Sequence, residues 1–213
     1  MEIKDLLKKD LMIMDLKSST KMEAIDEMVA KLKEKNIISD EAAFKNLILK
    51  REEKSSTGLG EGVAMPHAKT SVVNTPAVLF ARSNKGINYD ALDGEPVYIF
   101  FMIAASEDAH DLHIDTLAKL SKMLLNDDFT QGLKTCGTPD EVYTLIDKYS
   151  EKSQEAIKKE AKEVQNTNKK KILAVTACPT GIAHTYMAEA ALKEAGEKLG
   201  VDVKVETNGA DGI

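Results

Sequence analysis

An uninterrupted apolar run from Val97 to Ala105 constrains the fold of this chain more than any other segment. A strand is apolar at every position only when both of its faces are buried, so the run predicts a central strand over 97–104 in a covered sheet. The run is also far shorter than the roughly 20 residues that cross a bilayer as a helix. We therefore expect these residues in the middle of a globular domain.

Helix and strand signals surround this run up to about residue 150. Thr20 with Glu23 forms a capping box, Asp40 is a suitable helix cap, and Thr138 precedes a proline and an acidic first turn. We expect helices over about 3–8, 20–35, 40–51, 109–125 and 138–149, and strands over 11–16, 63–67, 77–83 and 97–104. This pattern predicts an α/β domain with a mixed sheet flanked by helices.

The composition changes between Ser150 and Lys171, where Lys, Glu, Gln, Asn and Ser replace nearly all large apolar residues. We expect a polar linker over 151–169, able to continue as a solvated helix in its first half and flexible near 165–168. The linker divides the 213 residues into a first domain over 1–150 and a second over 170–213.

The second segment has the pattern of one βαβ unit. An apolar strand over 172–176, a helix over 186–199 and a strand over 201–206 follow in order. The sequence stops at Ile213, before a parallel sheet with both faces covered is complete, so we expect an incomplete domain that is mobile or weakly packed.

The charge balance and the cysteine count exclude several classes of protein. A net charge of -6 opposes binding to nucleic acid, and no basic stripe with interleaved aromatics is present. Cys136 and Cys178 lack the spacing of a disulfide framework or of a cysteine zinc site. The acidic N-terminus lacks the pattern of a signal peptide, so we expect a cytoplasmic location.

A glycine-rich turn ends in a histidine, over 57–68 (TGLGEGVAMPHA). Three glycines permit close approach of another molecule, and Pro66 favours a strand that ends at His67. Such a position suits a nucleophile or a base, because a neutral imidazole is available at cytoplasmic pH. These residues alone are equally compatible with a structural histidine.

A second candidate, Cys178, follows a parallel strand and precedes a helix, where backbone amides and the helix dipole lower a thiol pKa and bind phosphate. Thr180 and Thr185 add hydroxyl donors, and Gly181 lets the chain wrap closely. Protein tyrosine phosphatases use a similar loop but require an arginine where this chain has His184. That difference favours a thiol that accepts a phosphoryl group and passes it on. The alternative is a buried cysteine at a strand end.

Two further interpretations concern cationic and metal-binding side chains. Arg51 is a possible phosphate partner near His67 in sequence, or a solvated cation at a helix end. His110 and His113 lie three residues apart on a predicted helix, so with His67 they are also a possible metal site. We favour phosphoryl chemistry, because transfer through single side chains needs no ion.

The chain resembles a known family at these segments. Arg51 to Glu53, residues 57–68 and residues 113–120 (HIDTLAKL) resemble the enzyme IIA domain of the fructose and mannitol branch of the bacterial sugar phosphotransferase system, over about residues 1–150. Residues 174–189 (AVTACPTGIAHTYMAE) are similar to the start of a fructose-type enzyme IIB domain.

The resemblance implies a phosphoryl relay that uses no cofactor. His67 would accept the phosphoryl group from the phosphocarrier protein HPr, and Cys178 would take it from His67. Arg51 and His113 would stabilise the group, and Glu61 would orient the site. The partners would be HPr and the IIB and membrane IIC domains, at the cytoplasmic face of the membrane. The sugar, reached only through IIB and IIC, would be fructose, with mannosyl-glycerate or mannitol as lesser options.

A second hypothesis is a regulatory module whose His67 phosphorylation state is read by a partner protein, as in nitrogen-type relatives of the same family. The Cys178 loop argues against it, because a purely regulatory domain needs no downstream thiol.

Overall fold

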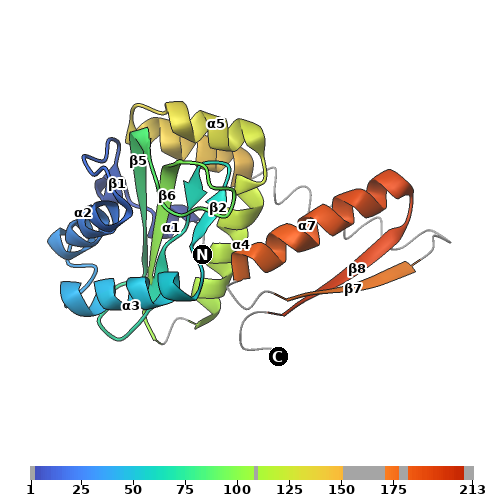
Figure 1. The fold of residues 1–213 in the computed structure, drawn as a ribbon, viewed down its shortest axis with the longest axis horizontal. Coiled ribbons are helices and arrows are strands. Elements are labelled where there is room, and N and C mark those ends of the chain that lie inside the picture. Colours follow the sequence, from blue (N-terminus) through green and yellow to red (C-terminus); the bar gives the residue numbers. More distant parts are fainter. Residues whose placement is uncertain (1–2, 108–109, 151–170, 178–181, 209–213) are drawn as a thin grey trace. The chain divides into compact units, whose positions relative to one another are not determined.

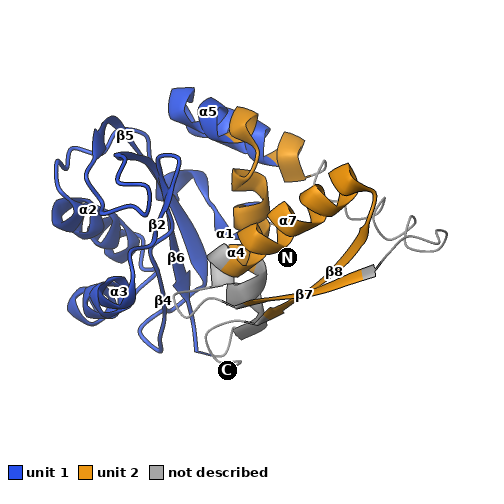
Figure 2. Cartoon of the chain, turned by 45° about the vertical axis from the view of Figure 1, so that its right-hand side comes forward, with its two compact units in different colours: residues 1–115, 130–146 blue, residues 116–129, 147–213 orange. Residues whose placement is uncertain are grey.

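The computed structural model describes residues 3–107, 110–150, 171–177 and 182–208. By their contacts they divide into two compact units, 1–115 with 130–146 and 116–129 with 147–213 (Figure 2). The predicted linker at 151–169 lies outside the described residues. Among the described residues, no helix combines the length and the apolar character needed to cross a membrane.

The first unit contains a six-stranded mixed sheet with the apolar run at its centre (Figure 1). Strand β6 (Val97–Ala105) pairs with β5 on one side and with β3 and β4 on the other. The other strands are β1 (Met12–Ile13), β2 (Gly58–Gly60), β3 (Val63–Ala64), β4 (His67–Lys69) and β5 (Ala77–Ile87). Pairs β5·β6 and β2·β3 are antiparallel, whereas β1·β5, β3·β6 and β4·β6 are parallel. The predictions of a mixed sheet and a central 97–104 strand are confirmed.

Both faces of β6 are covered. Phe100, Met102 and Ala104 belong to the main core cluster together with residues of two helices, while Phe101 and Ile103 on the opposite face are also buried. Every residue of the strand except Tyr98 is buried. Because both faces of the strand are buried, its residues are apolar at nearly every position.

Two helices cover one face of this sheet, α2 (Lys21–Glu34) and α3 (Glu41–Lys54), and they lie against each other (Figure 1). The predicted caps are present: Thr20 accepts from the Glu23 amide in a complete capping box, and Asp40 accepts from the Ala43 amide. The remaining helical segments are α1 (Ile3–Leu6), the short 3-10 turn Lys9–Leu11, α4 (His110–Leu124), α5 (Asp127–Thr135) and residues 139–150.

Several elements differ from the sequence predictions, among them β1, β5 and α5. Strand β1 has two residues instead of six, and just after it the Met14 carbonyl accepts from the Arg82 Nε at 3.1 Å. Strand β5 continues through Ile87, past the predicted end at 83. Helix α5 was not predicted, since Gly132 in its interior lowers helix propensity; a Cβ there would lie 2.9 Å from Leu145 Cδ1, so glycine permits close packing.

The C-terminal residues form the predicted βαβ unit. Strands β7 (Lys171–Ala177) and β8 (Asp202–Asn208) are parallel, with Lys171 opposite Asp202 and Ala177 opposite Asn208, and α7 (Ile182–Leu199) connects them. Leu173 and Val175 on β7 are 80% and 66% exposed. The apolar residues of this strand are therefore only partly covered by the described residues.

Candidate active site

His67 begins a strand rather than ending one. The partners of Val63 and Ala64 on β6 are Ile99 and Phe100, and the partner of His67 is Ile103, so β3 and β4 share one register along β6. Pro66 interrupts them because it has no N–H to donate, although its carbonyl still accepts from the Ile103 amide at 2.9 Å. The predicted strand end at His67 is thus wrong: pairing resumes after the proline.

One ring nitrogen of His67 is held by the backbone. Nδ1 lies 2.8 Å from the carbonyl oxygen of Met65, and a carbonyl oxygen can only accept, so Nδ1 carries the hydrogen. In the neutral ring the lone pair is then on Nε2. The half-buried His67 therefore presents a defined nucleophilic atom.

The surroundings keep this imidazole neutral. Desolvation lowers the pKa of His67 to about 4, the Met65 hydrogen bond opposes this shift, and the positive charge of Arg51 adds to it. At neutral pH the ring is therefore unprotonated at Nε2. A nucleophile for phosphorus needs this state.

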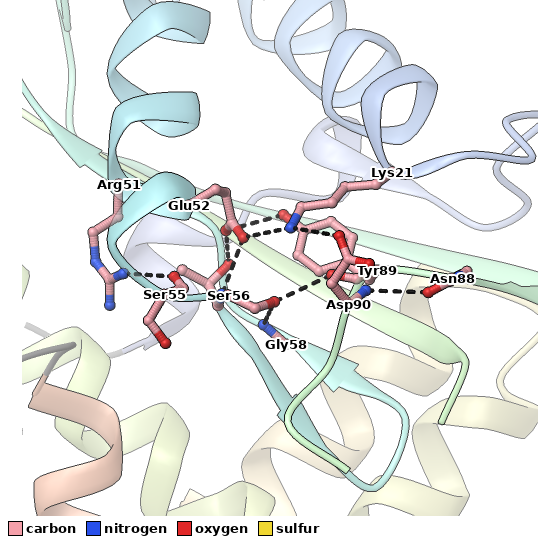
Figure 3. Close-up of polar contacts among 10 residues, drawn as sticks. Lys21, Arg51, Glu52, Ser55, Ser56, Gly58, Asn88, Tyr89 and Asp90 are labelled. Carbon is pink, nitrogen blue, oxygen red and sulfur yellow. Dashed lines mark hydrogen bonds and ion pairs between the residues drawn. The ribbon is translucent and has the colours of Figure 1, made fainter. Parts of the chain in front are cut away.

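Arg51 is brought to the site by the last turn of α3. Its Nη1 donates to the Ser55 carbonyl at 3.0 Å, which holds the side chain at the helix end (Figure 3). Its positive charge is one of the causes that lower the pKa of His67. A fixed guanidinium beside a nucleophile is suited to phosphoryl oxygens.

Glu61 lies at the tip of the β2–β3 hairpin with φ at 54°. Its amide donates to Asp93 Oδ2 at 2.8 Å, and its carbonyl accepts from Lys134 Nζ at 3.0 Å. The neighbouring Gly62 carbonyl accepts from the Tyr98 amide, whereas His67 pairs with Ile103. Tyr98 and Ile103 are five residues apart on β6, which corresponds to about 16 Å at ~3.3 Å per residue. The register therefore does not bring Glu61 to His67.

The other predicted site residues are described only in part. His110 and His113 lie on α4, but their side chains are outside the described part, as are Cys178, Thr180 and Gly181. Thr185 is buried in α7, and its carbonyl accepts from Thr176 Oγ1 at 3.2 Å. The proposed histidine metal site therefore also lies outside the described side chains, and those that are described contain no cluster suited to a metal.

A buried carboxylate beside Arg51 was missed at the sequence level. Glu52 is 9% exposed and accepts from the amide and hydroxyl of Thr57 and from the Tyr89 hydroxyl, while Lys21 Nζ lies 3.0 Å from its Oε2 (Figure 3). A signal was available, because Glu52 follows the core residues Phe44 and Ile48 at helical spacing. An acid on the apolar stripe of a helix requires buried partners.

Comparison with known proteins identifies this arrangement. Residues 5–149 match the family model described as "Phosphoenolpyruvate-dependent sugar phosphotransferase system, EIIA 2". The chain belongs to this EIIA 2 family. Residues 173–213 match a second model, described as "PTS system, Lactose/Cellobiose specific IIB subunit". The chain thus combines an EIIA 2 domain with a IIB-type segment, as the resemblance of the sequence implied.

A similar relative is the fructose-specific EIIABC component of Bacillus subtilis, which is 45% identical over all 213 residues. The chain spans about a third of that relative's length, 34%.

Two solved structures share the EIIA 2 fold. The nitrogen regulatory protein IIA-Ntr from Neisseria meningitidis has a TM-score of 0.62 at 27% identity, covering 67% of this chain and 97% of that one. The IIA of the Escherichia coli complex between mannitol enzyme IIA and phosphorylated enzyme IIB has a TM-score of 0.58 at 23% identity, covering 66% and 98%. Both confirm the α/β fold of the first domain.

Proposed function

We propose that this EIIA 2 domain accepts a phosphoryl group on Nε2 of His67 from phospho-HPr and delivers it to the cysteine of a IIB domain. The observation that carries the proposal is the 2.8 Å contact of Nδ1 with the Met65 carbonyl, which puts the ring hydrogen on Nδ1 and the lone pair on Nε2. The name of the Bacillus relative supports fructose as the sugar. The reaction would take place on the cytoplasmic side of the membrane.

In the first step the Nε2 lone pair attacks phosphorus, a new P–N bond forms, and the bond from phosphorus to HPr breaks. No oxidant, metal or cofactor enters the balance. Arg51 would neutralise charge on the phosphoryl oxygens, and we keep His113 as a second stabilising residue. Glu61 is left out of this step because of its position on the hairpin.

In the second step a thiolate attacks phosphorus and the P–N bond to His67 breaks. We propose Cys178 as this acceptor, with Thr180, Gly181 and Thr185 around the phosphoryl oxygens. The IIB match over 173–213 supports this assignment, as does the complex that the mannitol enzyme IIA of Escherichia coli forms with phosphorylated enzyme IIB. The division into 1–150, 151–169 and 170–213 belongs to the same proposal.

The test follows labelled phosphate from phosphoenolpyruvate through enzyme I and HPr to the full chain. We expect label that is lost in acid, as for a P–N bond, and no label in His67→Ala. His110→Ala is the matched control and should be labelled normally, which also separates phosphoryl transfer from a histidine metal site. Cys178→Ser should retain label on His67 and form no phosphothiol. Undiminished label in His67→Ala would overturn the assignment.

A regulatory module is the second candidate, favoured by the likeness to the nitrogen regulatory protein of Neisseria. In that case His67 would be phosphorylated while Cys178 would never carry phosphate. Absence of phosphothiol in a protein that contains the whole IIB domain would support regulation over sugar transfer.

A further inference from the structure

Among the residues that the structure describes, Glu52 is the only charged residue that is buried. Four donors converge on its carboxylate: the Thr57 amide and hydroxyl, the Tyr89 hydroxyl and the Lys21 ammonium. A carboxylate is acceptor-only and offers about four lone-pair sites, so its capacity matches the number of donors. This saturation offsets the cost of burying the charge.

Thr57 connects this carboxylate to the active histidine. Its amide donates to Glu52 Oε2 at 3.1 Å, and its carbonyl accepts from the Met65 amide at 2.9 Å. The Met65 carbonyl then accepts from His67 Nδ1 at 2.8 Å. Three hydrogen bonds, joined by the backbones of Thr57 and Met65, therefore connect Glu52 to the imidazole.

The segment that carries Thr57 is held from the other side as well. Ser56 Oγ donates to the Tyr89 carbonyl and accepts from the Gly58 amide, both at 3.1 Å (Figure 3). The Gly58 carbonyl accepts from the Leu92 amide at 3.2 Å. Thr57 therefore has little freedom to compensate for a change at Glu52.

The same carboxylate orients the end of α3. Arg51 and Glu52 leave the last turn in opposite directions, Arg51 toward Ser55 and Glu52 toward Tyr89 and Lys21 (Figure 3). Because adjacent helical residues rotate together, anchoring one side chain restricts the direction of the other. Glu52 thus constrains both the cation and the imidazole of the site.

We propose that Glu52 is a positioning residue for the His67 nucleophile: it holds Thr57, and through the Met65 backbone it keeps the hydrogen of His67 on Nδ1 and the lone pair on Nε2. This role rests on the proposed phosphoryl transfer. It does not require Glu52 to touch the phosphoryl group.

The decisive variant is Glu52→Gln, which keeps the size of the side chain. It replaces one acceptor oxygen with an NH2 group, which cannot accept from the two donors that faced that oxygen. Glu53→Gln is the matched control, because it removes the same charge from the exposed neighbouring position. Histidine-specific 15N spectra of the full chain at pH 7 report which ring nitrogen of His67 carries the hydrogen. The initial rate of phosphoryl transfer from phospho-HPr is measured in parallel.

We expect Nδ1–H in the wild type and in Glu53→Gln, and a mixture of both tautomers in Glu52→Gln with a transfer rate about 10- to 100-fold lower. A pure Nδ1–H form with wild-type transfer in folded Glu52→Gln would overturn the proposal. If that variant does not fold, the second variant is Glu52→Asp, which keeps the charge but shortens the side chain by one methylene group and so draws the carboxylate away from the Thr57 amide. A pure Nδ1–H form with wild-type transfer in Glu52→Asp would overturn the proposal equally. If the wild type accepts no phosphate, the proposed function fails, while the tautomer spectra still test the positioning role.

Discussion

The Nδ1 atom of His67 lies 2.8 Å from the carbonyl oxygen of Met65, two positions earlier in the chain. The intervening residue, Pro66, has no N–H and lies between two short strands that share one register along β6. The Met65 carbonyl therefore points toward the imidazole, while the strand register along β6 is the same before and after Pro66. This contact assigns the two ring nitrogens different chemical roles.

The first prediction concerns pH. Because the pKa of His67 is lowered to about 4, its Nε2 stays unprotonated and the rate of phosphoryl acceptance should be nearly constant from pH 8 to about pH 5, then fall near pH 4. An NMR titration of the His67 ring gives the midpoint independently. A midpoint near the ordinary value of ~6.5 would contradict the prediction.

The same shift affects stability. The unfolded chain binds a proton at His67 near pH 6.5 and the folded chain only near pH 4, so this contribution to the free energy of unfolding is complete above pH 6.5 and decreases as the pH falls toward 4. Urea unfolding at pH 7 and pH 5 should show a smaller loss of stability for His67→Gln than for the wild type. Equal losses would show that His67 makes no such contribution.

The second prediction concerns Arg51. Replacing it with Met removes a positive charge near the imidazole, so the pKa of His67 should rise, but only in part, because desolvation is the larger cause of its depression. Phosphoryl transfer should fall by about 10- to 1000-fold, since a charge-stabilising donor is lost. Lys50→Met, on an exposed position of the same helix, controls for the change in net charge and should alter neither quantity.

The third prediction concerns the packing of β2. A Cβ at Gly58 would lie 2.8 Å from the Ala91 Cα, a backbone atom that cannot move aside cheaply. Gly58→Ala should therefore lower the free energy of unfolding by about 1–3 kcal/mol, measured by chemical denaturation. Gly137→Ala serves as the control, because its Cβ would have no neighbour closer than 3.8 Å.

The fourth prediction concerns the start of α2. The Thr20 hydroxyl accepts from the Glu23 amide, and the Glu23 carboxylate accepts from the Thr20 amide. Thr20→Ala should cost about 1 kcal/mol of stability, and Thr20→Ser should restore most of it. A loss in Thr20→Ser as large as in Thr20→Ala would show that the hydroxyl is not the stabilising group.

Some elements could be predicted because their signals are local. The capping box at Thr20 and the cap at Asp40 involve residues within one turn, and the Val97–Ala105 run needs only the rule that a strand buried on both faces is apolar throughout. The shortening of β1 could not be read from its own residues. The carbonyl that follows β1, that of Met14, accepts from the side chain of Arg82, which is distant in sequence.

The candidate site divides in the same way. His67 and Arg51 were predicted from local pattern and family resemblance, and the charge of Arg51 contributes to the low pKa of His67. Glu61 was included only because the family resemblance implied it. An extended chain separates residues by about 3.3 Å at each step, so a neighbour six positions away in a strand can lie far from the site.

The sequence alone determined the class of fold and the family, and it predicted His67 as the candidate nucleophile, because these inferences depend on periodicity, caps and short segments of the chain. Only the tertiary structure decided which nitrogen of His67 carries the hydrogen, that the pKa of the ring is low, and that the Glu52 carboxylate accepts from the Thr57 amide. Those properties arise from desolvation and from hydrogen bonds between segments joined by the sheet. Neither effect leaves a pattern in neighbouring residues.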